Sequence, residues 1–327
     1  MERKVRLIFV VWVIALALLL GGCLLREANR PPVASFEAVP EEGYAPLPVS
    51  FDASGSYDPD GDRLTYEWDF GDGGEASGVR LVHTYAAGEY TVTLSVSDPD
   101  GLSDASLLTI VVAAVPSGYR LRRYEWTYEG EIQRWDVFVS EYLYQMYRGR
   151  IRSPFVDNYE YGDYVIDPLD DPTLEDMADE LWERAGGDSE GFSEYALGFV
   201  QGAIVYREDP TGAEWPLYPL ETLVDGVGDC EDTAILYVSL LRARGVPCKL
   251  AFVDTDGDSL PDHVLALVEV SPAYAGGISC GGSRVTVIPF GDRLFAVAET
   301  AGDSGSLRLG CDPWGLTPDD LIEVWSF

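Results

Sequence analysis

Cys230 and His263 are the two residues in the C-terminal part of this 327-residue sequence whose side chains suit nucleophilic chemistry. A glycine-containing loop leads into Cys230, and the apolar run after it has the spacing of a helix that Gly245 ends. Unpaired N–H groups and the dipole at a helix N-terminus favour a thiolate over a thiol. Acidic residues on both sides of Cys230 oppose that effect, so the sulfur needs a cationic partner.

His263 is the partner that the sequence offers, because the only other histidine, His83, lies far upstream. It begins an apolar strand over 264–268, and the pattern predicts antiparallel neighbours at 249–254, 285–289 and 294–300. A cysteine at a helix start and a histidine at a strand start is the layout of papain-like thiol enzymes, in which a third group orients the imidazole. Glu299, at the end of its strand, is the candidate for that role.

The cysteines leave a structural alternative open. In an oxidising exterior Cys230 can instead be a buried thiol or half of a disulfide with Cys248, and His263 a hydrogen-bonded core residue. If Cys230 is free, one disulfide remains to be formed. We expect it between Cys280 and Cys311, which both lie in glycine-bearing, loop-like sequences.

Four aspartates, Asp254, Asp256, Asp258 and Asp262, lie at nearly alternate positions just before His263. They resemble the first half of a calcium loop, although position 12, where an EF-hand has Glu, is Leu265. An acidic turn and a structural Ca²⁺ site are both compatible with the pattern. Bound Ca²⁺ would fix the loop that carries the base, whereas the chemistry itself requires no cofactor.

Other elements must position these residues. The spacing predicts an amphipathic helix from Pro172 to about Trp182 and a second over about 193–206 that carries Gln201. Residues 119–164 are rich in tyrosine and tryptophan, and their pattern assigns no element.

The N-terminal part reads as a β-sandwich over residues 31–115. Strict alternation over 64–70 and 90–97 predicts half-buried strands, with turn clusters such as 58–62 between them. That acidic cluster suits a turn or a Ca²⁺ loop. His83 is expected to be a structural, hydrogen-bonding residue, because no ligand cluster surrounds it.

The first residues predict export. Three basic residues precede an apolar run over 7–20, and residues 20–23 (LGGC) resemble a lipobox, which implies cleavage before Cys23 and its acylation. Residues 1–23 are then a lipoprotein signal peptide and 24–30 a linker. The alternative is an uncleaved anchor, although about 14 apolar residues fall short of the ~18 to 20 that span a bilayer. Either places the rest outside the cytoplasm, at the cell surface.

Composition excludes some partners. The net charge of -34 makes nucleic acid and anionic membrane faces poor partners and suits a salty or calcium-containing exterior. A hydrophobic content of 46% in 327 residues supports two packed domains besides the leader.

Residues 50–56 (SFDASGS), 68–73 (WDFGDG) and 83–85 (HTY) followed by 88–92 (GEYTV) resemble the motifs of a PKD domain, in order. The resemblance covers the whole predicted sandwich. It implies an immunoglobulin-like, non-catalytic spacer or adhesion module of an extracellular protein.

Residues 219–232 (PLETLVDGVGDCED) resemble the cysteine motif of the transglutaminase-like cysteine-protease superfamily. The resemblance spans about residues 174–314 and implies an α+β domain, within 119–327, in which Cys230 is the nucleophile and His263 the base. Glu299 occupies the position of the orienting acid, where Asp is commoner. Gln201 matches a glutamine that helps to form the oxyanion hole.

Together these features predict a lipid-anchored surface enzyme that acts on protein or peptide amides by acyl transfer from Cys230. Water as acceptor gives hydrolysis and an amine gives transamidation, and the sequence does not choose between them. The alternative is a non-catalytic, calcium-binding adhesion or scaffold protein.

Overall fold

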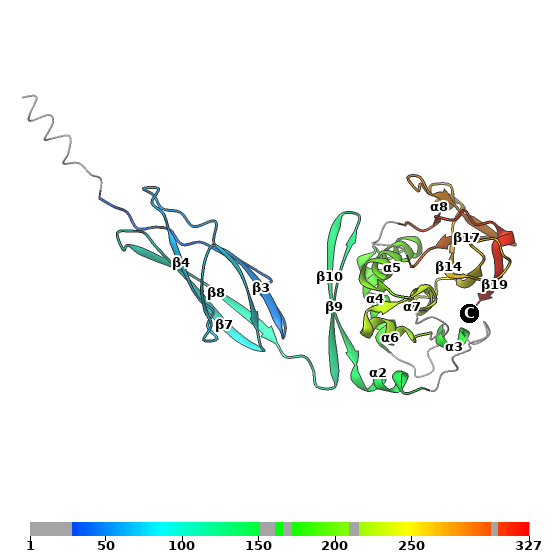
Figure 1. The fold of residues 1–327 in the computed structure, drawn as a ribbon, viewed down its shortest axis with the longest axis horizontal. Helices are drawn as coiled ribbons and strands as arrows, with labels where there is room; N and C mark the ends of the chain where they lie inside the picture. Colours follow the sequence, from blue (N-terminus) through cyan, green and yellow to red (C-terminus); the bar gives the residue numbers. More distant parts are fainter. Residues whose placement is uncertain (1–27, 151–160, 166–171, 209–215, 302–306, 327) are drawn as a thin grey trace, which may run out of the picture. The chain divides into compact units, whose positions relative to one another are not determined.

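A computed structural model describes residues 28–150, 161–165, 172–208, 216–301 and 307–326 (Figure 1). The predicted signal peptide and Cys23 lie outside these residues. The chain divides into two compact units between Val115 and Pro116. Among the described residues, no helix has the length and apolar character needed to cross a membrane.

The N-terminal unit is a sandwich of two sheets, in the orders β1-β3-β6 and β2-β8-β7-β4-β5. Phe51, Trp68 and Tyr85 fill the space between them, and all three side chains are buried. The strands are β1 Glu37–Val39, β2 Glu42–Tyr44, β3 Leu47–Asp52, β4 Thr65–Asp69, β5 Glu75–Ser77, β6 Arg80–Tyr85, β7 Gly88–Ser97 and β8 Ser103–Ala113. Alternating burial along β4 and β7 confirms the half-buried strands expected over 64–70 and 90–97.

Two polar features of this sandwich have structural roles. The His83 ring stacks on Phe70 with centroids 4.0 Å apart, and its Nε2 lies 2.7 Å from Asp72 Oδ2. This confirms the structural assignment of His83. In the acidic cluster, Asp58 Oδ1 accepts from the backbone N–H of Asp60, while the Asp60 carboxylate pairs with Arg30. Those contacts are typical of an acidic turn.

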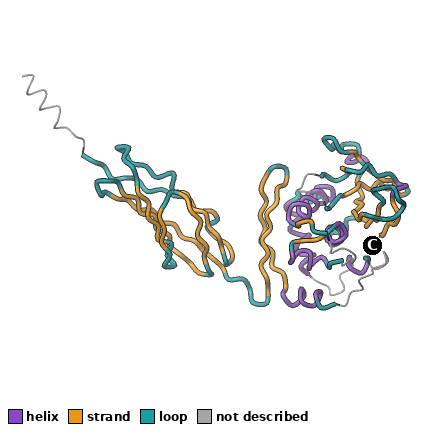
Figure 2. Tube along the Cα trace, viewed as in Figure 1, coloured by secondary structure: helices purple, strands orange, loops and turns teal. Residues whose placement is uncertain are grey.

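The C-terminal unit packs helices against a five-stranded sheet, with α7 lying directly on β13 and β14 (Figure 2). The helices are α2 Glu141–Arg148, α3 Gly162–Val165, α4 Pro172–Arg184, α5 Ser189–Ala203, α6 Pro219–Asp225, α7 Cys230–Ala243 and α8 Pro272–Ala275. The strands are β9 Tyr119–Tyr128, β10 Glu131–Ser140, β11 Val205–Tyr206, β12 Val227–Gly228, β13 Cys248–Val253, β14 His263–Val270, β15 Arg284–Val285, β16 Val287–Phe290, β17 Arg293–Ala298, β18 Cys311–Asp312 and β19 Leu321–Ser326.

The central sheet has the order β16-β17-β14-β13-β19 and is antiparallel throughout. Its middle strands are buried on both faces: Leu250 and Phe252 face the helices, whereas Ala251 and Val253 belong to a second core on the opposite side. Burial on both faces explains why these strands read as continuous apolar runs. The predicted strands around His263 are thereby confirmed, apart from β15, which pairs with β18 instead.

Three parts of the unit differ from the sequence expectation. Residues 119–140, to which no element was assigned, form the β9–β10 hairpin that packs against α5. Helix α5 ends at Ala203 rather than near Tyr206, because the β-branched pair Ile204-Val205 turns into β11. The C-terminal strand β19 completes the sheet edge beside β13 and was not anticipated.

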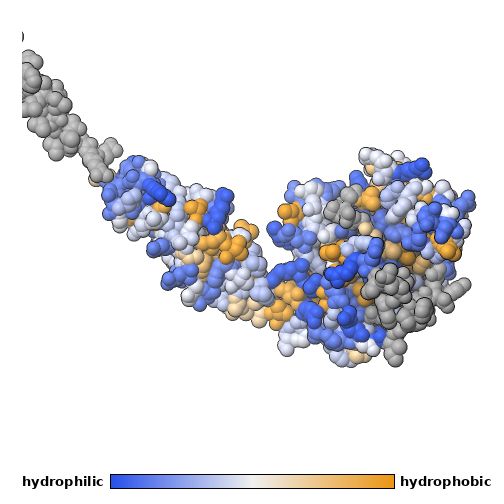
Figure 3. Space-filling model, viewed as in Figure 1, coloured by the Kyte–Doolittle hydropathy of each residue, from blue (hydrophilic) through white to orange (hydrophobic). Residues whose placement is uncertain are grey.

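The cysteines are arranged as one disulfide and two thiols in the C-terminal unit. Cys280 and Cys311 are bonded, which confirms the predicted pair. Cys230 and Cys248 are free, so the alternative Cys230–Cys248 disulfide is wrong. The visible faces of both units are largely hydrophilic, as the net charge requires (Figure 3).

Candidate active site

A tight connection between α6 and α7 delivers Cys230 to the first turn of α7. Gly226 ends α6 with a left-handed φ of 69°, and the Asp229 side chain then caps α7 by accepting from the backbone N–H of Asp232. Gly228 packs so closely that an added Cβ would lie 2.6 Å from Asp232 Cβ. Glycine at this position therefore lets the loop pass under α7 and fixes where the sulfur emerges.

The Cys230 sulfur is half-buried and lies between a carboxylate and a backbone donor. It donates to Glu231 Oε2 over 3.2 Å and accepts from the backbone N–H of Val264, the residue after His263. Burial, followed by the Glu231 charge, raises the pKa of the Cys230 thiol well above its ordinary value. Burial and the neighbouring carboxylate therefore both favour the thiol over the thiolate at this position.

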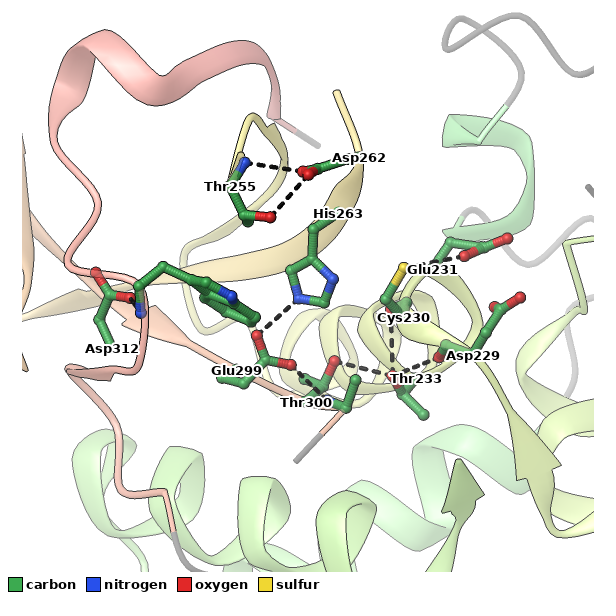
Figure 4. Close-up of polar contacts among 12 residues, drawn as sticks. Asp229, Cys230, Glu231, Thr233, Thr255, Asp262, His263, Glu299, Thr300 and Asp312 are labelled. Carbon is green, nitrogen blue, oxygen red and sulfur yellow. Dashed lines mark hydrogen bonds and ion pairs between the residues drawn. The ribbon is translucent and has the colours of Figure 1, made fainter. Parts of the chain in front are cut away.

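His263 and Glu299 meet at the ends of β14 and β17, as the sequence predicted. His263 Nε2 lies 2.7 Å from Glu299 Oε2, and Glu299 is 2% exposed. Glu299 Oε1 accepts from the backbone N–H of Ala301 over 2.7 Å, which fixes the carboxylate head. Because a carboxylate only accepts, Nε2 must carry the ring proton, which leaves Nδ1 as the basic nitrogen. Figure 4 shows His263 between Glu299 and Cys230.

A pair of threonines ties the helix that carries Cys230 to the strand that carries Glu299. Thr233 Oγ1 lies 3.0 Å from Thr300 Oγ1 and also donates to the Asp229 carbonyl over 2.7 Å (Figure 4). Both threonines are buried. The distance between the nucleophile and the orienting carboxylate is therefore set by a side-chain network inside the core.

Gln201 binds the backbone at Glu299, and among the described residues its hydrogen bonds do not include one to the Cys230 sulfur. Its Nε2 donates to the Glu299 carbonyl over 2.6 Å and to the Leu307 carbonyl over 3.1 Å. An amide nitrogen has two hydrogens, and these contacts use both. In this structure Gln201 is a positioning residue for Glu299. Neither of its amide hydrogens is left for the oxyanion role that the resemblance implies.

Two aromatic residues that sequence reasoning missed lie at the site. The Trp314 ring covers His263, with centroids 4.5 Å apart. Buried Asp312 holds that loop by accepting from the backbone N–H of Trp314 and Gly315 (Figure 4). The Asp312-Pro313-Trp314-Gly315 run is a turn signal, but nothing in it indicates which side chain the ring will cover.

Tyr206 is the second missed residue. Strand β11 pairs in parallel with β12, so that Tyr206 is opposite Gly228, two residues before Cys230. Burial and, after it, nearby acidic groups such as Asp229 raise the pKa of the Tyr206 phenol to about 12. The hydroxyl therefore stays protonated at neutral pH and can donate a hydrogen bond.

Three of the four predicted calcium ligands converge. Oxygen atoms of Asp254, Asp256 and Asp262 lie within 4.8 Å of one another, and Asp258 is not part of this group. The Asp258 side chain instead accepts from the backbone N–H of Leu260. Asp262 Oδ1 and Oδ2 bind Thr255, which closes the loop immediately before His263 (Figure 4). Clustered carboxylate oxygens are the donor set that suits a hard cation such as Ca²⁺.

Comparison with known proteins gives separate matches for the two units. Residues 29–112 match the family model for the PKD domain, and residues 175–275 match that for the transglutaminase-like superfamily. A microbial collagenase of Vibrio alginolyticus is 38% identical over 68 residues, which are 20% of this chain and 8% of the collagenase. The chain spans less than a tenth of the length of the curated collagenases that it matches.

Solved structures match in the same two ways. The PKD1 domain of Vibrio anguillarum Epp is 35% identical, covering 26% of this chain and 98% of that domain, with a TM-score of 0.23. Red sea bream transglutaminase is 13% identical, covering 83% of this chain and 50% of the enzyme, with a TM-score of 0.26. The N-terminal β-sandwich of this chain therefore matches the PKD domain family, and the α+β domain that follows it matches the transglutaminase-like superfamily.

Proposed function

We propose that this protein is an extracellular thiol enzyme that transfers acyl groups from protein or peptide amides through Cys230, His263 and Glu299. The observation that carries the proposal is the contact of His263 Nε2 with a buried, fixed carboxylate, while Cys230 accepts from the backbone beside the same histidine. That arrangement gives the sulfur a base with a defined tautomer. A buried thiol beside a carboxylate does not give up its proton readily, so it needs such a base to become a nucleophile.

In the first half of the reaction, His263 carries one proton from the Cys230 thiol to the departing amine. His263 Nδ1 takes the proton of the Cys230 thiol, and the thiolate attacks the substrate carbonyl carbon. Glu299 stabilises the imidazolium that forms, since its carboxylate faces the Nε2 hydrogen. Collapse of the tetrahedral intermediate breaks the C–N bond, and Nδ1–H protonates the departing amine. The acyl group then remains on Cys230 as a thioester.

Two groups are candidate donors to the oxyanion. The Cys230 backbone N–H belongs to the first turn of α7, whose N–H groups have no acceptor within the helix. The protonated Tyr206 hydroxyl is our candidate for the second donor, because Gln201 is engaged elsewhere. Helix geometry and the β11–β12 register support this assignment.

The second half of the reaction depends on the acceptor. When water attacks the thioester, His263 Nδ1 takes its proton and the carboxylic acid is released, which is hydrolysis. When a primary amine attacks, the same nitrogen takes the amine proton and a new amide forms, which is transamidation. In both cases the Cys230 thiol is regenerated and His263 returns to the neutral state.

The proposal places the enzyme at the cell surface, held by a lipid on Cys23 and separated from the membrane by the PKD domain. The sequence motif over 20–23 supports the anchor, and the matches to a PKD family and to collagenases support an extracellular setting. A structural Ca²⁺ on Asp254, Asp256 and Asp262 would hold the loop that ends at His263. In that case chelation with EGTA lowers activity without removing a reacting group, and activity unchanged by EGTA contradicts the calcium site.

Trapping of the acyl-enzyme tests the proposal without knowledge of the natural substrate. The full chain is mixed with p-nitrophenyl acetate, and the acetyl group is located by peptide mass spectrometry. We expect a thioester on Cys230 that decays with water, decays faster with a primary amine, and is absent in Cys230→Ser. A Cys248→Ala variant is the matched control, because Cys248 is the other free thiol among the described residues and is buried. Absence of acetylation at Cys230 would favour the scaffold alternative.

A further inference from the structure

The Asp312 carboxylate lies at the centre of the loop that places Trp314 over His263. The Asp312 side chain is fully buried. Its two oxygens accept from the backbone N–H groups of residues 314–316, three in succession, and Oδ2 also accepts from the Thr286 hydroxyl over 2.8 Å. Each oxygen thus accepts two hydrogen bonds, and together these use the roughly four lone-pair sites of a carboxylate.

The turn over 314–316 is shaped around that carboxylate. Three successive N–H groups can face one side chain only if the backbone curls, and Gly315 supplies the curl with a φ of 74°. A Cβ added at Gly315 would lie 2.4 Å from Arg284 Cδ, so the arginine stem packs directly against the turn. The backbone here has little room to adopt another path.

The loop is fixed at both ends, and Trp314 lies between them. At one end Cys311, the residue before Asp312, is buried and bonded to Cys280. At the other end Leu316 is buried in the second core, on the face of the sheet opposite the helices. The hydrogen bonds to Asp312 set the course of the chain between these two points, and with it the position of the indole.

Trp314 limits how the His263 ring can move. The two ring centroids lie 4.5 Å apart with an angle of 52° between the planes. The contact of Nε2 with Glu299 holds one atom of the imidazole, which leaves the ring able to tilt about that hydrogen bond. The indole against the ring restricts this tilt, and so keeps Nδ1 directed at the Cys230 sulfur.

We propose that Asp312 is a positioning residue for His263, and that it acts through the Trp314 ring. In Figure 4 Asp312 and Cys230 lie on opposite sides of His263, so the carboxylate is remote from the reacting sulfur. The inference rests on the proposed function for the role of His263 as base. It adds a residue outside the Cys230, His263 and Glu299 set on which the geometry of that base depends.

Replacing Asp312 by asparagine gives the sharpest perturbation. Both carboxylate oxygens accept from backbone N–H groups, so the NH₂ of an asparagine must face at least one of these donors in either orientation. A buried donor that faces another donor is costly, and the turn has to move to relieve the conflict. The indole moves with the turn, and His263 loses its restraint.

The histidine content allows a direct test, because His83 and His263 are the two histidines of the chain. The full chain is labelled with ¹⁵N-histidine, and the imidazole signals are recorded by NMR at a single pH of about 7.5 and assigned with His263→Ala. We expect Asp312→Asn to shift the His263 signals and to speed exchange of its Nε2 hydrogen with water, while the His83 signals stay in place. The matched control is Asp98→Asn, a buried aspartate that accepts from the Leu102 N–H in the N-terminal unit, which should leave His263 unchanged.

Alkylation of Cys230 by iodoacetamide tests whether the effect passes through Trp314. Asp312→Asn should slow alkylation about fivefold, as Trp314→Ala does, and the double variant should also be about fivefold slower. Independent effects would instead multiply to about 25-fold. Trp314→Phe keeps a ring over His263 and should keep the rate within about twofold of wild type.

Unchanged His263 signals in Asp312→Asn, or a double variant that is about 25-fold slower, would overturn the proposal. If Asp312→Asn does not fold, Thr286→Val takes its place, because it removes one donor to the carboxylate and keeps the side-chain shape. Thr286→Val should shift the His263 signals in the same direction and Thr286→Ser should restore them, and no shift in Thr286→Val would be contrary. Failure of the proposed function appears separately, as a His263→Ala variant that alkylates at the wild-type rate, and the NMR signals still decide the role of Asp312.

Discussion

Replacing Glu299 by glutamine should slow the alkylation of Cys230 more than replacing it by alanine. In the structure Oε1 accepts from the Ala301 N–H, so a glutamine must keep its carbonyl oxygen there and turn its NH₂ toward His263. The imidazolium that pairs with the thiolate carries a hydrogen on Nε2. In Glu299→Gln this N–H would face the glutamine NH₂, which is also a donor. Glu299→Ala removes the carboxylate without creating that conflict.

The magnitude follows from two terms. Loss of the charge-assisted contact to the imidazolium costs about 1.5–3 kcal/mol in both variants. In Glu299→Gln, either the donor conflict at His263 persists, or the amide flips and places NH₂ against the Ala301 N–H, which adds about 1–3 kcal/mol. At 1.36 kcal/mol per tenfold, glutamine should lower the rate roughly 10²- to 10⁴-fold and alanine roughly 10- to 10²-fold.

The assay is the second-order rate of Cys230 alkylation by iodoacetamide at pH 7.5, read by peptide mass spectrometry. It reports the fraction of thiolate paired with imidazolium and needs no substrate. Melting temperatures show whether both variants fold. If Glu299→Gln alkylates as fast as Glu299→Ala or faster, the tautomer argument from the Ala301 contact is refuted.

Three further predictions follow from the electrostatics. Burial and, after it, the Glu231 charge raise the Cys230 pKa, so Glu231→Gln should speed alkylation at pH 7 roughly 3- to 30-fold; a slower rate would show that Glu231 instead positions the sulfur. Trp314→Ala opens the His263–Glu299 contact to water and should slow alkylation about fivefold. An unchanged alkylation rate would contradict this prediction. Burial raises the Cys248 pKa to about 12, so only the unfolded thiol ionises between its ordinary pKa and that value. Cys248 should make the unfolding free energy fall there by up to about 1.4 kcal/mol per pH unit in urea titrations, in addition to the slope from Cys230, and Cys248→Ala should lose only the Cys248 share.

The parts of this account that sequence alone could supply are those with a local signature. The helix start at Cys230, the strand at His263 and the acidic strand end at Glu299 each lie in a strong periodic pattern. Their convergence was expected from the resemblance to papain-like and transglutaminase-like enzymes, in which residues at these positions meet. The disulfide was predicted because Cys280 and Cys311 both lie in glycine-bearing, loop-like sequences.

The parts that escaped depend on long-range contacts. Gln201 reaches Glu299 and Leu307 across the fold, so its donors could not be seen to be engaged. Tyr206 owes its place to the β11–β12 pairing, which involves two residues from each strand and has no periodic signal. The direction of the Cys230 pKa shift depends on how deeply the sulfur is buried and how near the Glu231 charge lies, which requires coordinates.

The most direct test of the central claim is the pH dependence of Cys230 alkylation by iodoacetamide in the full chain and in His263→Ala. If His263 draws the proton from the thiol, the wild-type rate near pH 7 should exceed that of the variant by about 10² or more, and the variant should react only as pH approaches the raised thiol pKa. Identical profiles for the two proteins would mean that His263 does not activate Cys230, and would contradict the proposed enzyme.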